Sequence, residues 1–283
     1  MNSLPTLKKI SEHLNISVST VSRALKDHPD VSAETIRRVK ELANLMEYEP
    51  NGFAVNLRKR KSETYAILVP EISGYFYHSF IQAVEEEARK QGFGVMIMQS
   101  MDDPKVEAEN LRICRYNHVA GVFAAITSST TDLSPFHKTM DFEIPVVFFD
   151  KVPETGSFPC ITMPDEEAAA IAARRSILSD KAKTLCLLGD PSLSITRHRR
   201  SGFENVYLEA GRPLPEVCHL SHEEAAFAFI SDKGMKELDD TAIFCMSDQI
   251  LCGAMRALYK LGTRIPAQVA IIALSNGFMP RFF

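Results

Sequence analysis

The sequence predicts an α/β protein with a small N-terminal helical head and a larger body of two parallel-sheet subdomains. In the first fifty residues, apolar side chains recur at the spacing of amphipathic helices, and a capping residue precedes each segment. From Tyr65 onward, short apolar runs alternate with amphipathic segments, which is typical of βαβ units around a parallel sheet. A chain of 283 residues has room for both parts.

The head is expected to hold three helices, over residues 7–14, 18–26 and 33–46. A hydroxyl side chain before a helix can accept a hydrogen bond from a free N–H group of the first turn. Around Asn15 only a few residues separate the first two helices, and asparagine tolerates the left-handed conformation of a tight turn. Two helices joined so closely form a helix-turn-helix. The expected caps are Thr6, Ser17 and Ser32.

A basic segment follows the head, after the helix-breaking sequence at residues 49–52. Ala54 and Leu57 are three residues apart, so a helix would place them on one face, with cations directly behind from Arg58 onward. Such an apolar wedge can open a base step from the minor groove while the cations neutralise phosphates. The alternative is a solvated basic linker. The predicted domains are residues 1–49 for the head, 50–62 for a hinge helix and linker, and 63–283 for the body.

The body is expected to alternate strands and helices. The irregular stretch at residues 152–159 is interpreted as the crossover between the two subdomains. Strands are expected at residues 65–70, 93–98, 120–126, 145–150, 184–189, 242–246 and 269–274, and helices at residues 76–91, 104–116, 165–178, 198–210, 222–236 and 248–261.

Charge is distributed unevenly between the two parts. Residues 1–61 hold 11 lysines and arginines against 7 acidic residues, whereas the rest of the chain holds 21 against 29. This distribution indicates that only the head meets a polyanion. Apolar residues make up 45% of the chain and charged residues 24%, as in ordinary globular proteins, which argues against a disordered, collagen-like or low-complexity chain.

Several other classes lack their sequence signals. No apolar run approaches the roughly 20 residues of a membrane helix, and the first residues lack the apolar core of a signal peptide, so a cytoplasmic protein without membrane contact is expected. Six cysteines occur singly, without a CxxC pair, so neither a zinc site nor a disulfide framework is expected, and no cofactor. The motifs GxGxxG, GxxxxGK[ST], GxSxG and HExxH do not occur, so no enzyme class has its minimum parts.

The second predicted helix carries the first candidate site. A recognition helix in the major groove presents its first-turn residues to base edges. Val18 and Ser19 occupy those positions here, followed by Thr20 and Arg23, which can contact phosphates or bases. The alternative is a three-helix bundle that serves as a protein interaction module.

The head resembles the headpiece of the LacI/GalR transcription regulators. The resemblance runs without a gap over residues 5–58, and its TVSR…VS..T…V motif is highly specific. Asn15 and Glu47 stand where the family often has glycine, and both affect turns rather than contacts. The resemblance implies that Leu57 is the minor-groove lever. It also implies contacts with operator DNA from Thr6, Ser17, Val18, Ser19, Thr20 and Arg23, and the hinge residues Ala54 and Arg58 belong to the same candidate site.

The body is similar, more loosely, to the family's periplasmic-binding-protein-like effector domain. That resemblance places a small-molecule cleft between the two subdomains, at the carboxyl ends of the strands. Ser275 stands where sugar-responsive members commonly carry an aspartate. Phe76 and Tyr77 can equally be core residues, and Asp248 can be a helix cap. The residues carried over to the cleft are Phe76, Tyr77, Asp150, Arg199, Asp248 and Ser275.

Together these observations predict a sequence-specific DNA-binding repressor that works as a homodimer on operator DNA. A small-molecule effector, a sugar or a related metabolite, is expected to control its affinity for DNA. The alternative is a ligand-processing α/β enzyme with an appended DNA-binding head. Because family members continue beyond the position that matches Phe283, the body is expected either to be incomplete at its C-terminus or to close in an unusual way.

Overall fold

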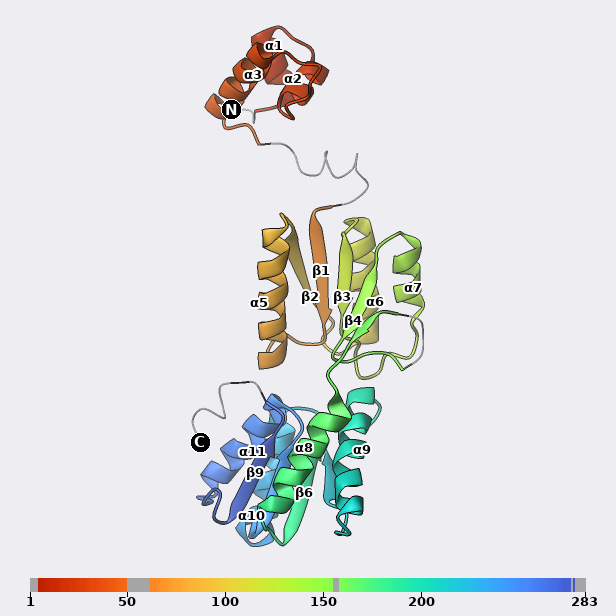
Figure 1. Ribbon diagram of the computed structural model, residues 1–283, viewed down its shortest axis with the longest axis vertical. Coiled ribbons are helices and arrows are strands. Elements are labelled where there is room, and N and C mark those ends of the chain that lie inside the picture. Colours follow the sequence, from red (N-terminus) through yellow and green to blue (C-terminus); the bar gives the residue numbers. More distant parts are fainter. Residues whose placement is uncertain (1–4, 50–61, 155–157, 276, 278–283) are drawn as a thin grey trace. The chain divides into compact units, whose positions relative to one another are not determined.

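The computed structural model describes residues 5–49, 62–154, 158–275 and 277, and the chain divides into two compact units, Met1–Arg60 and Lys61–Phe283 (Figure 1). The hinge residues Ala54, Leu57 and Arg58 lie outside the described residues.

The first unit contains the three predicted helices, α1 (Leu7–Leu14), α2 (Val18–Ala24) and α3 (Ala33–Leu45). Each begins after the expected cap, and the hydroxyl oxygen of that cap accepts a hydrogen bond from an N–H group of the first turn. The donors are the N–H groups of Lys9, Thr20 and Thr35.

Left-handed residues form the turns of this unit. Asn15 ends α1 with φ 51° and ψ 45°, so the tight turn of the predicted helix-turn-helix is confirmed. Glu47, directly after α3, has φ 51°, a left-handed conformation that glycine adopts at no steric cost. This explains why glycine suits this position in the family that the head resembles. A small apolar core holds the three helices together and consists of Ile10, Val21, Ala24, Val39 and Ala43.

The first subdomain of the second unit is a parallel sheet of strand order β2-β1-β3-β4-β5. Side chains of β1 alternate between its two faces, as the two-residue period of a strand requires. Ala66 and Leu68 pack in the core that includes α6 and α7, and Ile67 and Val69 pack in the core that includes α5, on the other side of the sheet (Figure 1). The elements are β1 (Thr64–Val69), α5 (Tyr75–Lys90), β2 (Gly94–Gln99), α6 (Pro104–Tyr116), β3 (Gly121–Ala124), α7 (Ser134–Asp141), β4 (Val146–Phe149) and β5 (Cys160–Ile161).

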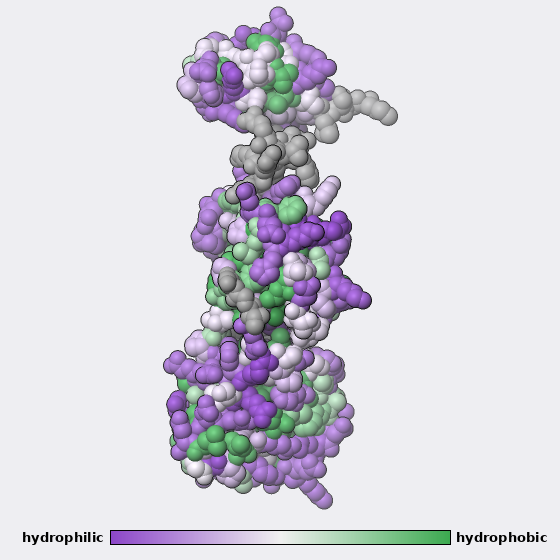
Figure 2. All heavy atoms as spheres, turned by 90° about the vertical axis from the view of Figure 1, so that its right-hand side faces the viewer, coloured by the Kyte–Doolittle hydropathy of each residue, from purple (hydrophilic) through white to green (hydrophobic). Residues whose placement is uncertain are grey.

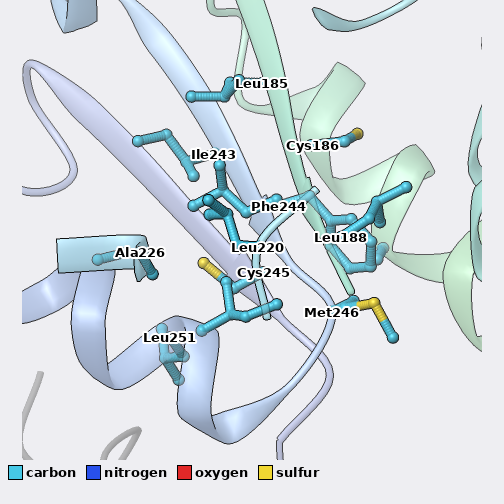
Figure 3. Close-up of a cluster of buried hydrophobic side chains, with 14 of the residues drawn as sticks. Leu185, Cys186, Leu188, Leu220, Ala226, Ile243, Phe244, Cys245, Met246 and Leu251 are labelled. Atoms are coloured by element: carbon cyan, nitrogen blue, oxygen red, sulfur yellow. The ribbon is translucent and has the colours of Figure 1, made fainter. Parts of the chain in front are cut away.

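The second subdomain is a parallel sheet of strand order β7-β6-β8-β9. Its large core is built around the fully buried strand β8 (Figure 3). Phe244 of this strand stacks on Phe203 of α9, with ring centroids 4.7 Å apart. The elements are α8 (Asp165–Leu178), β6 (Lys183–Leu188), α9 (Ser194–Glu209), β7 (Glu216–His219), α10 (Glu223–Leu238), β8 (Thr241–Cys245), α11 (Asp248–Lys260) and β9 (Val269–Ala273).

Two glycines allow the helices of this subdomain to approach closely. A Cβ atom added at Gly202 of α9 would lie 2.1 Å from the carbonyl oxygen of Glu166 on α8. One added at Gly253 of α11 would lie 2.1 Å from the carbonyl oxygen of Glu223 on α10. No other residue type fits at these contacts without moving a helix backbone.

The predicted fold class is confirmed, but the predicted position of the crossover is wrong. The stretch at residues 152–159 leads into β5, which pairs with β4 in the first sheet. The chain passes to the second subdomain only at residues 162–164, directly before α8. Three short elements were not predicted from the sequence, namely α7, β5 and β7, each of which has eight residues or fewer.

The six cysteines differ in burial. Cys114 is buried in the first subdomain, and Cys186 and Cys245 are buried in the second. All six are unbonded, and no group of three or more His, Cys, Asp or Glu side chains within the described ranges could hold a metal ion.

Among the described residues, no helix has the length and apolar character needed to cross a membrane. The face shown in Figure 2 carries mostly hydrophilic side chains on the second subdomain, with smaller apolar areas among them.

Candidate functional site

The first part of the candidate site is the exposed surface of α2. The cap residue Ser17 organises the first turn: its Oγ accepts a hydrogen bond from the Thr20 N–H at 3.1 Å. The same oxygen lies 2.7 Å from Ser19 Oγ and 2.8 Å from Thr20 Oγ1. Val18 is 43% exposed, and the side chains of Ser19 and Arg23 are also exposed. The predicted contact residues of α2 therefore form one solvent-facing surface.

The chemistry of the α2 surface suits a nucleic acid. The first turn of a helix offers free N–H groups and a partial positive charge, which favour a phosphate. Thr6 is exposed at the start of α1, where a second helix N-terminus lies next to the basic residues Lys8 and Lys9. Val18 supplies an apolar contact for a thymine methyl group, and hydroxyl and guanidinium groups supply hydrogen bonds to bases or phosphates. Lys8 and the exposed Lys26 are basic residues that the sequence analysis did not include.

The second part of the candidate site lies at the carboxyl ends of the strands in the second unit. Tyr77, near the start of α5, donates a hydrogen bond from its hydroxyl to Asp150 Oδ2 at 2.7 Å. Asp150 directly follows β4 and has φ 57°, a strained conformation for a residue with a side chain. Burial raises the pKa of the Asp150 carboxyl and, together with the charge of Asp150, that of the Tyr77 hydroxyl.

Phe76 belongs partly to the core, as the alternative interpretation expected. Its ring lies 5.5 Å from that of Tyr77 and 6.4 Å from that of Phe80, between ring centroids, in the cluster that covers one face of the first sheet. Both Phe76 and Tyr77 remain partly exposed. They can therefore contribute to packing and still present an edge to a ligand.

Arg199 is held within the second subdomain. It is 8% exposed, its Nε donates to Asp165 Oδ1 at 2.8 Å, and its Nη1 donates to the carbonyl oxygen of Met246. The guanidinium also acts on Asp150 of the first subdomain, whose carboxyl pKa its charge lowers. Arg199 is therefore both a structural tie between α8, α9 and the end of β8 and a positive charge near Asp150.

Asp248 and Ser275 are brought together. Ser275 Oγ donates a hydrogen bond to Asp248 Oδ1, and the Gly277 N–H donates to Ser275 Oγ at 3.2 Å. Asp248 is not the cap of α11, because Ser247 occupies that position and accepts from the Ile250 N–H. The serine that replaces a family aspartate thus has a carboxylate beside it.

Several contacts join the carboxyl ends of the two sheets. Ser192 Oγ lies 2.9 Å from the carbonyl oxygen of Ser128, and Ser194 Oγ donates to that of Val152 at 3.3 Å. Arg197 forms an ion pair with Glu154. These residues follow β3, β4 and β6, so the carboxyl ends of the strands in the two subdomains face each other.

Polar residues that the sequence analysis missed also lie here. They include Asp102, Ser128, Asp165 and Asp190, each of which follows a strand by a few residues or begins the next helix. The carboxyl ends of parallel strands meet at one edge of a sheet, and that rule could have identified them.

A cavity of about 290 Å³ lies at the amino ends of strands β6, β7 and β8, among residues 181–185, 212–216 and 233–241. Its lysines already have partners: Lys181 donates to Ala267 O, Lys183 donates to Glu237 O, and Lys233 pairs with Glu216. This cavity shares no residue with the contacts that join the carboxyl ends of the two sheets.

Comparisons with known proteins match both parts of the chain to the LacI family. Residues 6–51 match the family described as bacterial regulatory proteins, lacI family, and residues 62–279 match that of periplasmic binding proteins and the sugar binding domain of the LacI family. The HTH-type transcriptional regulator DegA of Bacillus subtilis is 27% identical over 277 residues, covering 96% of this chain and 81% of DegA. The ribose operon repressor of the same species is 27% identical over 280 residues, covering 96% and 82%.

Solved structures give the same fold. The lac repressor dimer bound to operator and the anti-inducer ONPF superposes with a TM-score of 0.83 at 18% identity, covering 97% of this chain and 83% of that one. A periplasmic binding protein/LacI transcriptional regulator from Alkaliphilus metalliredigens, complexed with D-xylulofuranose, gives a TM-score of 0.67 at 23% identity and covers 78% and 81%.

Proposed function

Because the chain belongs to the lacI family of bacterial regulatory proteins, we propose that it binds operator DNA through α2 and changes its operator affinity when a small molecule binds in the cleft. The family makes it a DNA-binding transcriptional regulator and not an enzyme. The observation that carries the proposal is the surface of α2, where a capped helix N-terminus presents Val18, Ser19 and Arg23 to solvent.

The proposed DNA contacts are Thr6, Ser17, Val18, Ser19, Thr20 and Arg23, together with the hinge residues Ala54, Leu57 and Arg58, which rest on the sequence motif alone. The proposed domains are residues 1–49, 50–62 and 63–283, supported by the division of the chain at residue 60 and by the family matches to 6–51 and 62–279. A single head offers few base contacts, so a homodimer on a near-palindromic site is part of the proposal. Its place of action is the cytoplasm, where bacterial DNA lies.

The proposed effector site is the cleft residues Phe76, Tyr77, Asp150, Arg199, Asp248 and Ser275. Their carboxylates, hydroxyls and guanidinium are acceptors and donors suited to a polyhydroxylated ligand, and the rings of Phe76 and Tyr77 suit its apolar face. Solved relatives complexed with D-xylulofuranose and with cellobiose support a sugar or sugar derivative as the class of effector.

Selection of DNA from a randomised duplex library tests the DNA-binding proposal. We expect the full chain to enrich sites with dyad symmetry, because two symmetric heads read two half-sites. Sequencing of the selected pool measures this. Enrichment of an asymmetric site without a second half at fixed spacing would contradict the proposal.

Matched variants make this selection specific. Arg23→Ala removes an exposed cation of α2 and should weaken binding to the selected site. Arg37→Ala removes an exposed cation of α3 that already pairs with Glu34 and Glu41, and should leave binding close to that of the unaltered chain.

The cleft proposal predicts a loss of effector affinity in Asp150→Asn. A charge-assisted hydrogen bond contributes about 1.5–3 kcal/mol, so the dissociation constant should rise more than tenfold. Asparagine tolerates the left-handed conformation at this position, so the variant keeps its fold. Melting temperatures with a panel of sugars, sugar acids and nucleobases identify the stabilising compound, and titration then gives its affinity. Asp141→Asn, an exposed change on α7, is the control and should not alter that affinity.

A further inference from the structure

A buried carboxylate anchors the loop that follows β3. Glu107 lies in the first turn of α6 and is 2% exposed. Its Oε2 accepts a hydrogen bond from the Thr127 N–H at 3.1 Å, and its Oε1 accepts from Thr130 Oγ1 at 2.7 Å. A charged side chain is almost never buried to this extent without such partners. The residue therefore fixes both ends of the loop at residues 127–130.

A second carboxylate holds the middle of the same loop. Asp102 Oδ1 accepts a hydrogen bond from the Ser128 N–H at 2.9 Å, and its Oδ2 accepts from Ser128 Oγ. Asp102 and Glu107 thus bind neighbouring residues of one short segment. The negative charge of Asp102 raises the pKa of Glu107.

The anchored loop reaches the second subdomain. Ser192 Oγ lies 2.9 Å from the carbonyl oxygen of Ser128 and 2.6 Å from Asp190 Oδ1. Its single proton can be donated to only one of these acceptors at a time. The Ser192 N–H also donates to Asp190 Oδ1 at 2.8 Å, which holds the turn after β6 in place. A path of hydrogen bonds therefore runs from α6, through the loop, to the turn after β6 in the second subdomain.

Burial raises the pKa of Glu107 to about 7, with a further contribution from the charge of Asp102, while the hydrogen bonds from Thr130 and Thr127 lower it. The loop itself carries no titratable side chain. The charged and titratable groups on the neighbouring segments include Asp103 and Lys105 at the start of α6, Asp132 after the loop, and Lys151 after β4, whose carbonyl oxygen accepts from the Ile126 N–H. On the second subdomain they include Asp190 and His219, whose ring nitrogen lies 2.7 Å from the carbonyl oxygen of Gly189.

We propose that Glu107 is a positioning residue of the effector cleft, and that its protonation sets how firmly the 127–130 loop is held against the second subdomain. The role of this loop at an effector site rests on the proposed function, because the effector is proposed to bind between the strand ends that the loop and Ser192 connect. Neither Glu107 nor Asp102 is part of the proposed effector or DNA contacts.

The direction in which anchoring changes with pH follows from the difference in the pKa of Glu107 between the anchored and released states. The anchored state holds its proton up to about pH 7, whereas an exposed glutamate releases it near its ordinary pKa of about 4.3. Anchoring is therefore fully stabilised below the ordinary pKa and weakens as the pH rises toward 7. Above that value both states are ionised, and the balance no longer changes with pH.

Hydrogen exchange of the full chain, without DNA or ligand, tests the proposal. After correction for intrinsic exchange, protection of a peptide covering residues 126–131 should fall by up to about tenfold per pH unit between pH 5 and 7, and should level off above pH 7. Protection of residues 190–193 should fall over the same interval. Glu107→Gln keeps an acceptor for Thr127 without a titrating proton, so its protection should not depend on pH.

Two further variants separate positioning from a merely structural role. Glu109→Gln, on the exposed side of α6 where Glu109 pairs with Arg112, should keep the pH profile of the unaltered chain. Asp102→Asn removes a neighbouring negative charge and should shift the profile to lower pH. A flat profile in the unaltered chain, a profile that persists in Glu107→Gln, or a response confined to the loop would overturn the proposal. The experiment contains no DNA or effector, so these outcomes leave the DNA-binding proposal standing, and a failed DNA selection leaves this one standing.

Discussion

Arg199→Ala is expected to lower the free energy of unfolding by about 3–5 kcal/mol, because it leaves the Asp165 carboxylate buried without its partner. The two side chains are 10% and 5% exposed, and their closest atoms are 2.8 Å apart. Denaturant unfolding followed by circular dichroism measures the loss. Arg200→Ala, the next residue, removes an arginine that is 48% exposed and pairs with Glu204 along the same helix, and should change the stability by about 0.5 kcal/mol or less.

A double variant distinguishes a lost ion pair from lost packing. Replacing both members together, as Asp165→Leu with Arg199→Met, removes the uncompensated charge and should restore most of the stability. An Arg199→Ala protein as stable as Arg200→Ala would show that the pair contributes nothing. The structural role of Arg199 also bears on its proposed effector role, since a lost effector response in Arg199→Ala is informative only if the variant is folded.

Gly202→Ala is the second large effect that we expect, with a loss of about 1–3 kcal/mol. The added methyl group would meet the carbonyl carbon and oxygen of Glu166, and backbone atoms cannot rotate away as a side chain can. Helices α8 and α9 must then separate. Thermal unfolding by calorimetry measures the change, with Ser201→Ala as the neighbouring control. Equal melting temperatures for the two variants would refute the close contact.

The head could be predicted almost completely from the sequence, because its structure is determined by local interactions. Thr6, Ser17 and Ser32 cap helices through hydrogen bonds that span only three residues, and Asn15 forms its turn by its own backbone preference. The overlooked elements of the body depend on distant partners. Strand β5 has two exposed residues, and its pairing with β4 defines it rather than any apolar pattern of its own.

The cleft could be predicted less completely. Asp150 and Tyr77 were carried over from the resemblance to a known family, and the hydrogen bond between them joins residues 73 positions apart. Glu107 was not identified, because an acidic residue in the first turn of a helix is ordinary in a sequence. Only the fold shows that it is buried and that it binds a loop 20 residues away.

The buried cysteines give each subdomain its own reporter of local unfolding. Burial raises the pKa of Cys114 to about 11 and that of Cys245 to about 12, so neither thiol forms the reactive thiolate at neutral pH while the fold is intact. An alkylating reagent reaches them only when the surrounding core opens. Because Cys114 lies in the first core and Cys245 in the second, mass tags on the two peptides record the opening of the two subdomains separately within one molecule.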